Sequence, residues 1–131
     1  MKTLIVEDEI TGRMILQDIL GAYGLVHAVV NGIEAVESVK QALADDDPYD
    51  LICMDIMMPE MDGQQALQDI RDYEDEAGVG LGQGAKVIMV TALGDVKNVC
   101  TAYNRLCDGY LVKPVDASAL RQELLNLKLI H

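Results

Sequence analysis

Leu51-Ile-Cys-Met-Asp55 is a run of four apolar residues that ends on a single acid. Short runs of similar apolar and β-branched composition recur along the chain, at residues 4–6, 25–30, 87–90 and 110–112. Runs of this length that are apolar at nearly every position are typical of strands buried on both faces. The sequence therefore predicts five buried strands.

Amphipathic helical patterns follow the strands. Each pattern repeats its apolar residues at helical spacing, so that they share one face of a helix. The five segments with this spacing are 15–23, 36–43, 67–73, 96–107 and 120–127. Strand and helix thus alternate five times along the chain.

Residues that start and stop helices agree with these patterns. Asn31 lies three residues before Glu34, as in a capping box, and Gly24 is placed to end the first helix. Residues 74–85, with glycines at 78, 80, 82 and 84, are predicted to form a flexible surface loop. Three more N-cap candidates precede helical patterns: Asp62, Asp95 and Asp116.

The alternation of buried strands and helices predicts a parallel sheet with helices on both faces, because right-handed crossovers restrict how the chain can wind. The expected fold class is α/β, a doubly wound (βα)5 flavodoxin-like sandwich. Its five-stranded sheet is expected in the order 2-1-3-4-5, an order adopted from known folds of this size. Residues 1–131 are expected to form a single domain without an output domain.

Composition excludes several classes of partner and of catalytic site. Twenty-two acidic and ten basic residues give a net charge of −12, which opposes binding to nucleic acid or anionic lipid. No apolar run reaches the roughly 18 residues of a membrane span, so we expect a cytoplasmic protein with no membrane contact. His27 and His131 are the only imidazoles, which excludes a histidine-based zinc site and a Ser-His-Asp triad. Any chemistry must rest on carboxylates, lysine and hydroxyls.

Acidic residues gather where the predicted strands end. Ligands of doubly wound folds bind at the carboxyl ends of the strands. Glu7 and Asp8 follow the first strand and Asp55 ends the third, and such closely placed like charges require protons or a cation. Each acid alone would be an ordinary solvated loop residue, but together they suit Mg²⁺, which prefers oxygen ligands and keeps several waters.

The fourth and fifth strands end on residues that suit a phosphoryl group. Lys113 supplies a positive charge for a phosphoryl oxygen, and Thr91 supplies a hydroxyl for another. A carboxylate can accept a phosphoryl group as an acyl phosphate, in a transfer that depends on alignment and charge neutralisation. Asp55 is the central candidate for that carboxylate.

Four ordered motifs lie around the ends of the predicted strands: Leu4-Ile-Val-Glu-Asp-Glu9, Met54-Asp-Ile-Met-Met-Pro-Glu-Met-Asp-Gly63, Val90-Thr-Ala92 and Gly109-Tyr-Leu-Val-Lys-Pro114. With these motifs the chain resembles a response-regulator receiver domain of two-component signalling, close to the stand-alone receivers of chemotaxis. The resemblance covers essentially the whole sequence.

The resemblance implies a role for each site residue. Asp55 would be the phosphoacceptor, and Lys113 would hold the phosphoryl group. Asp8, Asp55 and the carbonyl of Met57 would bind Mg²⁺ directly, and Glu7 would bind it through water. Glu7 is longer than the aspartate more usual at its position, so its contact with the metal is expected to differ.

The resemblance also implies a switch and partners. Thr91 and Tyr110 would move together on phosphorylation and change the surface of the fourth helix, fifth strand and fifth helix; from its strand pattern alone, Tyr110 would be a core or half-buried aromatic. The Lys113–Pro114 peptide is expected to be cis. The expected partners are a histidine kinase or histidine phosphotransfer protein as donor and a target protein on this surface, and phosphorylation-dependent dimerisation is left open.

Other functions remain to be compared with this one. A receiver would assist only its own phosphorylation and dephosphorylation. A Mg²⁺-dependent phosphohydrolase with an aspartyl nucleophile would hydrolyse external phosphate esters, and it needs an acid two residues after the nucleophile. Met57 occupies that position here. A flavin or nucleotide carrier needs a glycine- or hydroxyl-rich cradle where this chain has Glu7 and Asp8. A phosphorylation-independent interaction module is the remaining alternative.

Overall fold

The computed structural model describes residues 1–56, 63–80, 82–92 and 107–131. The first half contains β1 (Lys2–Val6), α1 (Ile10–Leu20), a 3₁₀ turn (Gly21–Tyr23), β2 (Leu25–Val29), α2 (Gly32–Ala44) and β3 (Leu51–Asp55). The second half contains α3 (Gly63–Glu76), β4 (Lys86–Thr91), β5 (Gly109–Val112) and α5 (Ala117–Asn126). The helical pattern at 96–107, except its last residue, and the predicted caps Asp62 and Asp95 lie outside the described residues.

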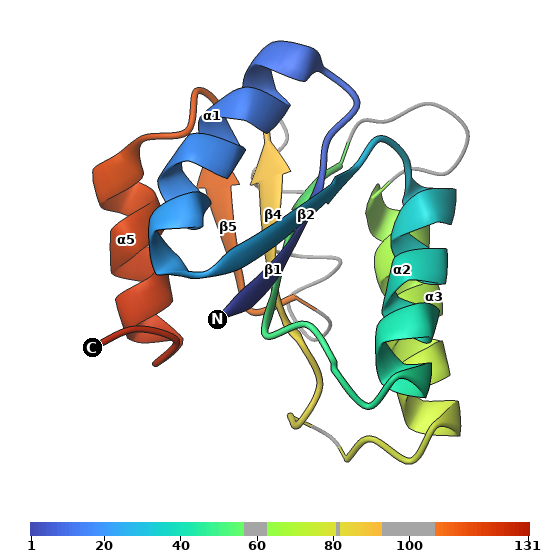
Figure 1. The fold of residues 1–131 in the computed structure, drawn as a ribbon. Helices are drawn as coiled ribbons and strands as arrows, with labels where there is room; N and C mark the ends of the chain where they lie inside the picture. Colours follow the sequence, from blue (N-terminus) through green and yellow to red (C-terminus); the bar gives the residue numbers. More distant parts are fainter. Residues whose placement is uncertain (57–62, 81, 93–106) are drawn as a thin grey trace.

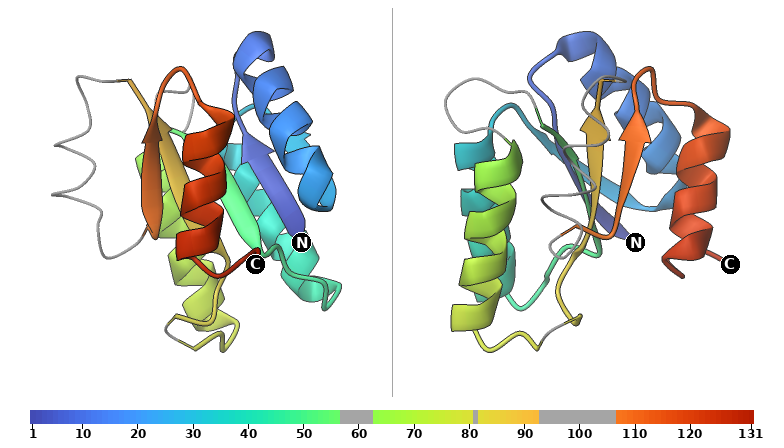
Figure 2. Two further views of the ribbon diagram at one scale, coloured as in Figure 1. Left: turned by 90° about the vertical axis from the view of Figure 1, so that its left-hand side faces the viewer. Right: turned by 180° about the vertical axis from the view of Figure 1, so that it is seen from behind.

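The five strands form one parallel sheet in the order β2-β1-β3-β4-β5, which confirms the predicted α/β sandwich. Helices α1 and α5 cover one face of the sheet, and α2 and α3 cover the other (Figure 1). The same three layers are seen from the side and from behind (Figure 2). Among the described residues, no helix combines the length and apolarity that crossing a bilayer would need.

Neighbouring residues of each central strand serve opposite sides of the core, because side chains alternate along a strand. Leu4 and Val6 belong to the core cluster under α2 and α3, whereas Ile5 belongs to the cluster under α1 and α5. All three are fully buried. This double burial explains why β1, β3 and β4 read as continuous apolar runs. The prediction of five buried strands was wrong for β2, which is exposed or partly exposed along its whole length because it is an edge strand.

The two described caps confirm their predictions. The side chain of Asn31 accepts a hydrogen bond from the Glu34 amide at 2.8 Å, and Asp116 accepts one from the Ser118 amide at 3.2 Å. The prediction that Gly24 ends the first helix was wrong, since α1 ends at Leu20. A 3₁₀ turn follows α1, and Gly24 closes that turn with φ 147°.

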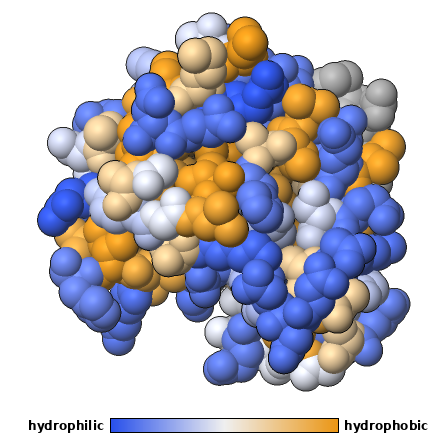
Figure 3. Space-filling model, viewed as in Figure 1, coloured by the Kyte–Doolittle hydropathy of each residue, from blue (hydrophilic) through white to orange (hydrophobic). Residues whose placement is uncertain are grey.

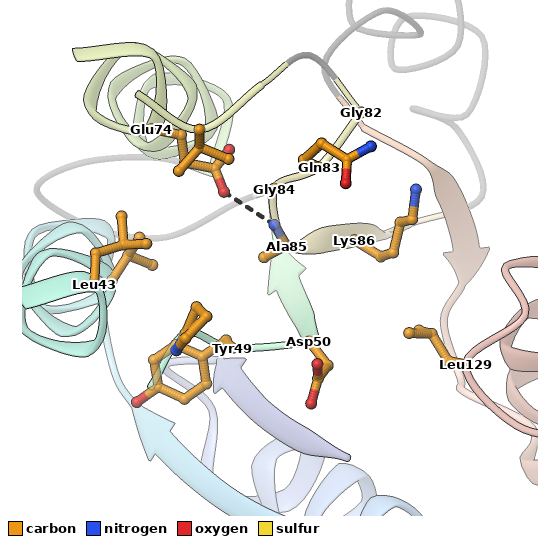
Figure 4. Close-up of a pocket in the computed structure, with 13 residues that line it drawn as sticks. Leu43, Tyr49, Asp50, Glu74, Gly82, Gln83, Gly84, Ala85, Lys86 and Leu129 are labelled. Atoms are coloured by element: carbon orange, nitrogen blue, oxygen red, sulfur yellow. Dashed lines mark hydrogen bonds between the residues drawn. The ribbon is translucent and has the colours of Figure 1, made fainter. Parts of the chain in front are cut away.

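The loop predicted over residues 74–85 was given too early a start, because α3 continues to Glu76. Glu74 belongs to α3 and is buried. Its Oε2 accepts a hydrogen bond from the Ala85 amide at 2.9 Å (Figure 4). Its Oε1 lies 2.7 Å from Arg71 Nη1. Arg71 in turn donates to the Ala85 carbonyl at 2.8 Å. The acidic end of α3 therefore holds the loop that enters β4, a long-range role that local polarity does not reveal.

A cavity of about 280 Å³ lies beside this anchor, at the amino ends of β3 and β4. Its lining includes Leu43, Tyr49, Glu74, Lys86 and Leu129 (Figure 4). It is at the edge of the sheet opposite to the ends that carry Glu7 and Asp55. The face seen in Figure 1 shows apolar side chains scattered among hydrophilic ones (Figure 3).

Candidate metal and phosphoryl site

The carboxyl ends of four strands meet at one edge of the sheet. Strand register brings Asp55 opposite Val90, and Thr91 opposite Val112. Backbone hydrogen bonds extend the alignment beyond the strands: Lys113 N donates to Thr91 O at 2.8 Å and Glu7 N donates to Val29 O at 3.1 Å. The residues that follow the strands are thus fixed by the sheet itself.

The three predicted acids come together at this edge. Glu7, Asp8 and Asp55 each offer a carboxylate oxygen, and these oxygens lie within 4.8 Å of one another. Glu7 and Asp55 are buried, with 1% and 5% of their surface exposed, whereas Asp8 is exposed. The cluster is closed by the protein on one side and open to solvent on the Asp8 side.

Lys113 reaches two of the acids at once. Its Nζ lies 3.0 Å from Asp55 Oδ2 and 3.0 Å from Glu7 Oε1. Burial lowers the pKa of Lys113, but its hydrogen bonds to Glu7 and Asp55 and their negative charges outweigh burial, so the pKa is raised. The lysine is therefore a fixed positive charge beside Asp55.

The ionised form of Glu7 is disfavoured in the folded protein. Burial, followed by its hydrogen bond with Asp55 and the charge of that residue, raises the pKa of Glu7 to about 7, although Lys113 acts in the opposite direction. If all three acids were ionised beside one ammonium, the four groups would carry a net charge of −2. That excess is what a divalent cation would neutralise.

The donor set fits Mg²⁺. Glu7 Oε2 is buried and has no hydrogen-bond partner among the described residues. A buried polar atom without a partner is costly, and a metal-bound water would supply one. Carboxylate oxygens with an open, hydrated side are the ligands that Mg²⁺ prefers. The predicted fourth ligand, the Met57 carbonyl, lies outside the described residues.

The two predicted switch residues stand on adjacent strands. Thr91 is buried, and its Oγ1 donates to the Ala92 carbonyl at 3.2 Å. Tyr110 is opposite Met89 in β5 and is 38% exposed, so it is a half-buried aromatic and does not belong to the core. Among the described residues, its strand β5 forms one edge of the sheet.

The link from β5 to α5 places Lys113 beside its partners. The Lys113–Pro114 peptide is cis, the isomer that the resemblance implies. Lys113 and Pro114 border a cleft of about 340 Å³, which Glu7 and Ile15 also line. Glu7 therefore lies beside a partly apolar cleft between α1 and the segment after β5.

Two supporting residues were not singled out from the sequence. Arg13 Nη1 donates to the Glu7 carbonyl at 3.1 Å and so holds the backbone of that acid. Gly63 begins α3 against the end of β3, where an added Cβ would clash with the carbonyl of Asp55 and lie 2.9 Å from the Cα of Ile56. Gly63 was visible within a motif, but the sequence carries no local signal for the contact of Arg13.

Known proteins share this fold. The response regulator receiver domain family matches residues 3–125. The chain is 33% identical over 125 residues to chemotaxis protein CheY of Bacillus subtilis, a match that covers 94% of this chain and 93% of that protein. A chain of the CheX–CheY–BeF3–Mg complex from Borrelia burgdorferi superposes with a TM-score of 0.78 and 27% identity, over 99% of this chain and 90% of that one.

A further similar structure is the response regulator protein TrrA of Thermotoga maritima in complex with Mg and BeF. It has a TM-score of 0.74 and 26% identity, over 96% of this chain and 97% of that one. The family match, the sequence relative and the shared fold all extend over nearly the whole chain, and they agree with the acidic edge described above. The chain belongs to the response regulator receiver domain family, the phosphoryl-accepting signalling modules of two-component systems.

Proposed function

We propose that Asp55 is the residue of this receiver that accepts the phosphoryl group, from a phosphohistidine donor and with Mg²⁺ bound at the acidic edge. The observation that carries the proposal is the position of Asp55. Its carboxylate is buried at the end of β3, paired with Lys113 at 3.0 Å and grouped with Glu7 and Asp8. Glu7 is also buried and also lies 3.0 Å from Lys113, but it follows β1, whereas Asp55 ends the central strand β3.

The metal would be held by Asp8 and Asp55 directly, by Glu7 through water and by the carbonyl of Met57. When bound, Mg²⁺ supplies positive charge to the phosphoryl oxygens as charge develops on them. The unpaired Oε2 of Glu7 and the exposed position of Asp8 support this assignment. The open side at Asp8 suits an ion that retains several waters.

The protein's own groups would then act around the phosphorus. An Oδ atom of Asp55 forms the new O–P bond as the N–P bond of the donor breaks, and the bonding pair returns to the imidazole nitrogen. Lys113 contacts both Asp55 and Glu7 in this structure, and its ammonium group would bind a phosphoryl oxygen. The Thr91 hydroxyl would leave the Ala92 carbonyl and donate to another phosphoryl oxygen.

Output would pass through the surface of the fourth helical segment, β5 and α5. Tyr110 lies exposed on β5, next to the strand that carries Thr91, so movement of Thr91 could be coupled to its rotation. We assign the donor as a histidine kinase or phosphotransfer protein, and the target as a protein that binds this surface. Phosphorylation-dependent dimerisation and a cytoplasmic location remain predictions.

Receivers are signalling modules, and we infer that this one turns over no external substrate. The phosphohydrolase alternative lacks its usual acid, because Met57 stands two residues after Asp55. Rapid hydrolysis of varied phosphomonoesters by the purified protein would support that alternative instead.

The direct experiment is intact mass after incubation with acetyl phosphate and Mg²⁺. We expect one phosphoryl adduct on the wild type, no adduct on Asp55→Asn and none in EDTA. Asp72→Asn is the matched control, since Asp72 is an exposed acid on α3 whose side chain accepts a hydrogen bond from Gln68. An adduct of equal yield on Asp55→Asn would refute the assignment of the acceptor.

A further inference from the structure

Gly12 occupies the first turns of α1, where its backbone does not require glycine. It is the third residue of that helix, and its φ lies outside the left-handed region that only glycine adopts readily. Glycine is also a poor helix former compared with alanine. A reason for glycine at this position must therefore come from the space around it.

That space is filled by one side chain. A Cβ at position 12 would lie 2.6 Å from Glu7 Oε1, 3.3 Å from its Cδ and 3.4 Å from its Cγ. The three nearest atoms all belong to Glu7, and the shortest distance is far below ordinary contact. The missing side chain of Gly12 is thus the room in which the carboxylate of Glu7 lies.

Glu7 cannot move away without losing contacts. Its side chain is buried, and the oxygen that faces Gly12 is the one that Lys113 holds at 3.0 Å. Its backbone is tied to Val29 and, through its carbonyl, to Arg13. A methyl group at position 12 would either break the contact with Lys113 or push α1 away from the sheet.

The conflict depends on the length of the acid. Aspartate is one methylene shorter than glutamate, so a carboxylate oxygen takes about the place of Cδ and no atom takes the place of Oε1, the atom nearest to position 12. The closest positions left from the present set would be those of Cδ and Cγ, at 3.3 Å and 3.4 Å, and the contact of 2.6 Å would be gone. A bulkier residue at position 12 is therefore compatible with aspartate at position 7 but not with glutamate.

We propose that Gly12 is a positioning residue: because it has no side chain, an acid as long as glutamate fits at position 7. It allows glutamate to reach Lys113 and the acidic cluster, and so tunes the metal site without touching the metal or the phosphoryl group. The coupling of Gly12 and Glu7 stands on geometry alone, whereas its effect on Mg²⁺ rests on the proposed function.

The test is a double-mutant comparison of Gly12→Ala in the wild type and in Glu7→Asp. The first measurement is thermal unfolding in EDTA, which needs no metal. We expect Gly12→Ala to lower Tm in the wild type, and to leave it unchanged or raise it by a few degrees in Glu7→Asp, because alanine is the better helix former. Gly21→Ala is the control, since nothing lies within 4 Å of a Cβ placed there.

The second measurement is Mg²⁺ affinity by calorimetric titration of the same proteins. We expect Gly12→Ala to weaken binding about tenfold or more in the wild type, the scale seen when a ligand loses its orienting contact. In Glu7→Asp the same change should alter affinity less than about twofold, and Gly21→Ala should not alter it. Failure of wild type and control alike to bind Mg²⁺ would refute the proposed metal site, while the unfolding data would still decide the coupling.

Equal effects of Gly12→Ala in both backgrounds would overturn the proposal, as would no effect in the wild type. If Gly12→Ala alone fails to fold, a folded Glu7→Asp/Gly12→Ala protein would support the proposal. Misfolding of both proteins would overturn it.

Discussion

Lys113 Nζ lies 3.0 Å from Asp55 Oδ2, although 58 residues separate them in the sequence. The same nitrogen lies 3.0 Å from Glu7, so one lysine compensates two buried carboxylates. A group that binds Asp55 in the resting protein is already placed where a phosphoryl oxygen on Asp55 would be.

Replacing Lys113 should separate its two roles. We expect Lys113→Met to slow phosphorylation by acetyl phosphate by about a hundredfold, the scale for removing one group that stabilises developing charge. Binding of Mg²⁺ should become tighter, because the lysine no longer competes for Glu7 and Asp55. Rates by intact mass and affinity by calorimetry would measure the two effects.

Lys40→Met is the control for this change, because Lys40 lies on α2 in a surface pair with Glu37. It should leave both quantities unchanged. Weaker Mg²⁺ binding by Lys113→Met would show that the lysine supports the metal site rather than competing with the ion.

The pKa of Glu7 predicts a pH dependence of stability. The folded value is about 7 against an ordinary 4.5, so between these values the folded protein retains a proton that the unfolded chain has lost. This contribution is fully present below pH 4.5 and is lost as pH rises through 7. In EDTA, wild type should therefore lose stability relative to Glu7→Gln between pH 5 and pH 8, by up to about 3 kcal/mol.

Urea unfolding at the two pH values would measure that difference. Added Mg²⁺ should restore the wild type at pH 8 more than it restores Glu7→Gln, because the ion stabilises the ionised acid. A stability difference that is the same at pH 5 and pH 8 would contradict the assigned ionisation of Glu7.

Glu74 should matter for stability and not for phosphorylation. Glu74→Ala would leave the Ala85 amide and one hydrogen-bonding position of Arg71 without their carboxylate, at a cost of about 2 to 3 kcal/mol. Asp75→Ala, at the exposed neighbouring position, should cost less than about 0.5 kcal/mol. Urea unfolding and the acetyl phosphate assay would test both; a slower phosphorylation of folded Glu74→Ala would contradict the separation of the two ends of the sheet.

Much of the fold could be predicted because the central strands β1, β3 and β4 are buried on both faces and are therefore nearly continuous apolar runs. The acids at the strand ends could be predicted together for the same reason, since parallel strands deliver their carboxyl ends to one edge. The end of α3 could not, because its polar residues resemble a loop until the contact between Glu74 and Ala85 is seen.

The closest packing in the site was also invisible in the sequence. A glycine in a helical pattern signals only a weak helix position. That Gly12 makes room for Glu7, or that Gly63 lies against the carbonyl of Asp55, depends on how α1 and α3 approach the sheet. Such approach distances are set by the whole core, and local propensity does not encode them.

Gly63 gives the last prediction, because it couples the start of α3 to the position of Asp55. Its amide donates to the Ile56 carbonyl at 2.9 Å, and a Cβ would clash with the Asp55 carbonyl. Relief of that clash must move either the helix or the strand end, since both are backbone. We expect Gly63→Ala to destabilise the fold by about 1 to 3 kcal/mol and to slow phosphorylation of the molecules that remain folded.

Gly21→Ala is the control and should do neither. Urea unfolding and the rate of phosphorylation, followed by intact mass, would compare the two variants. Normal kinetics in a destabilised Gly63→Ala protein would mean that the helix yields and Asp55 keeps its place, so that the glycine serves packing alone.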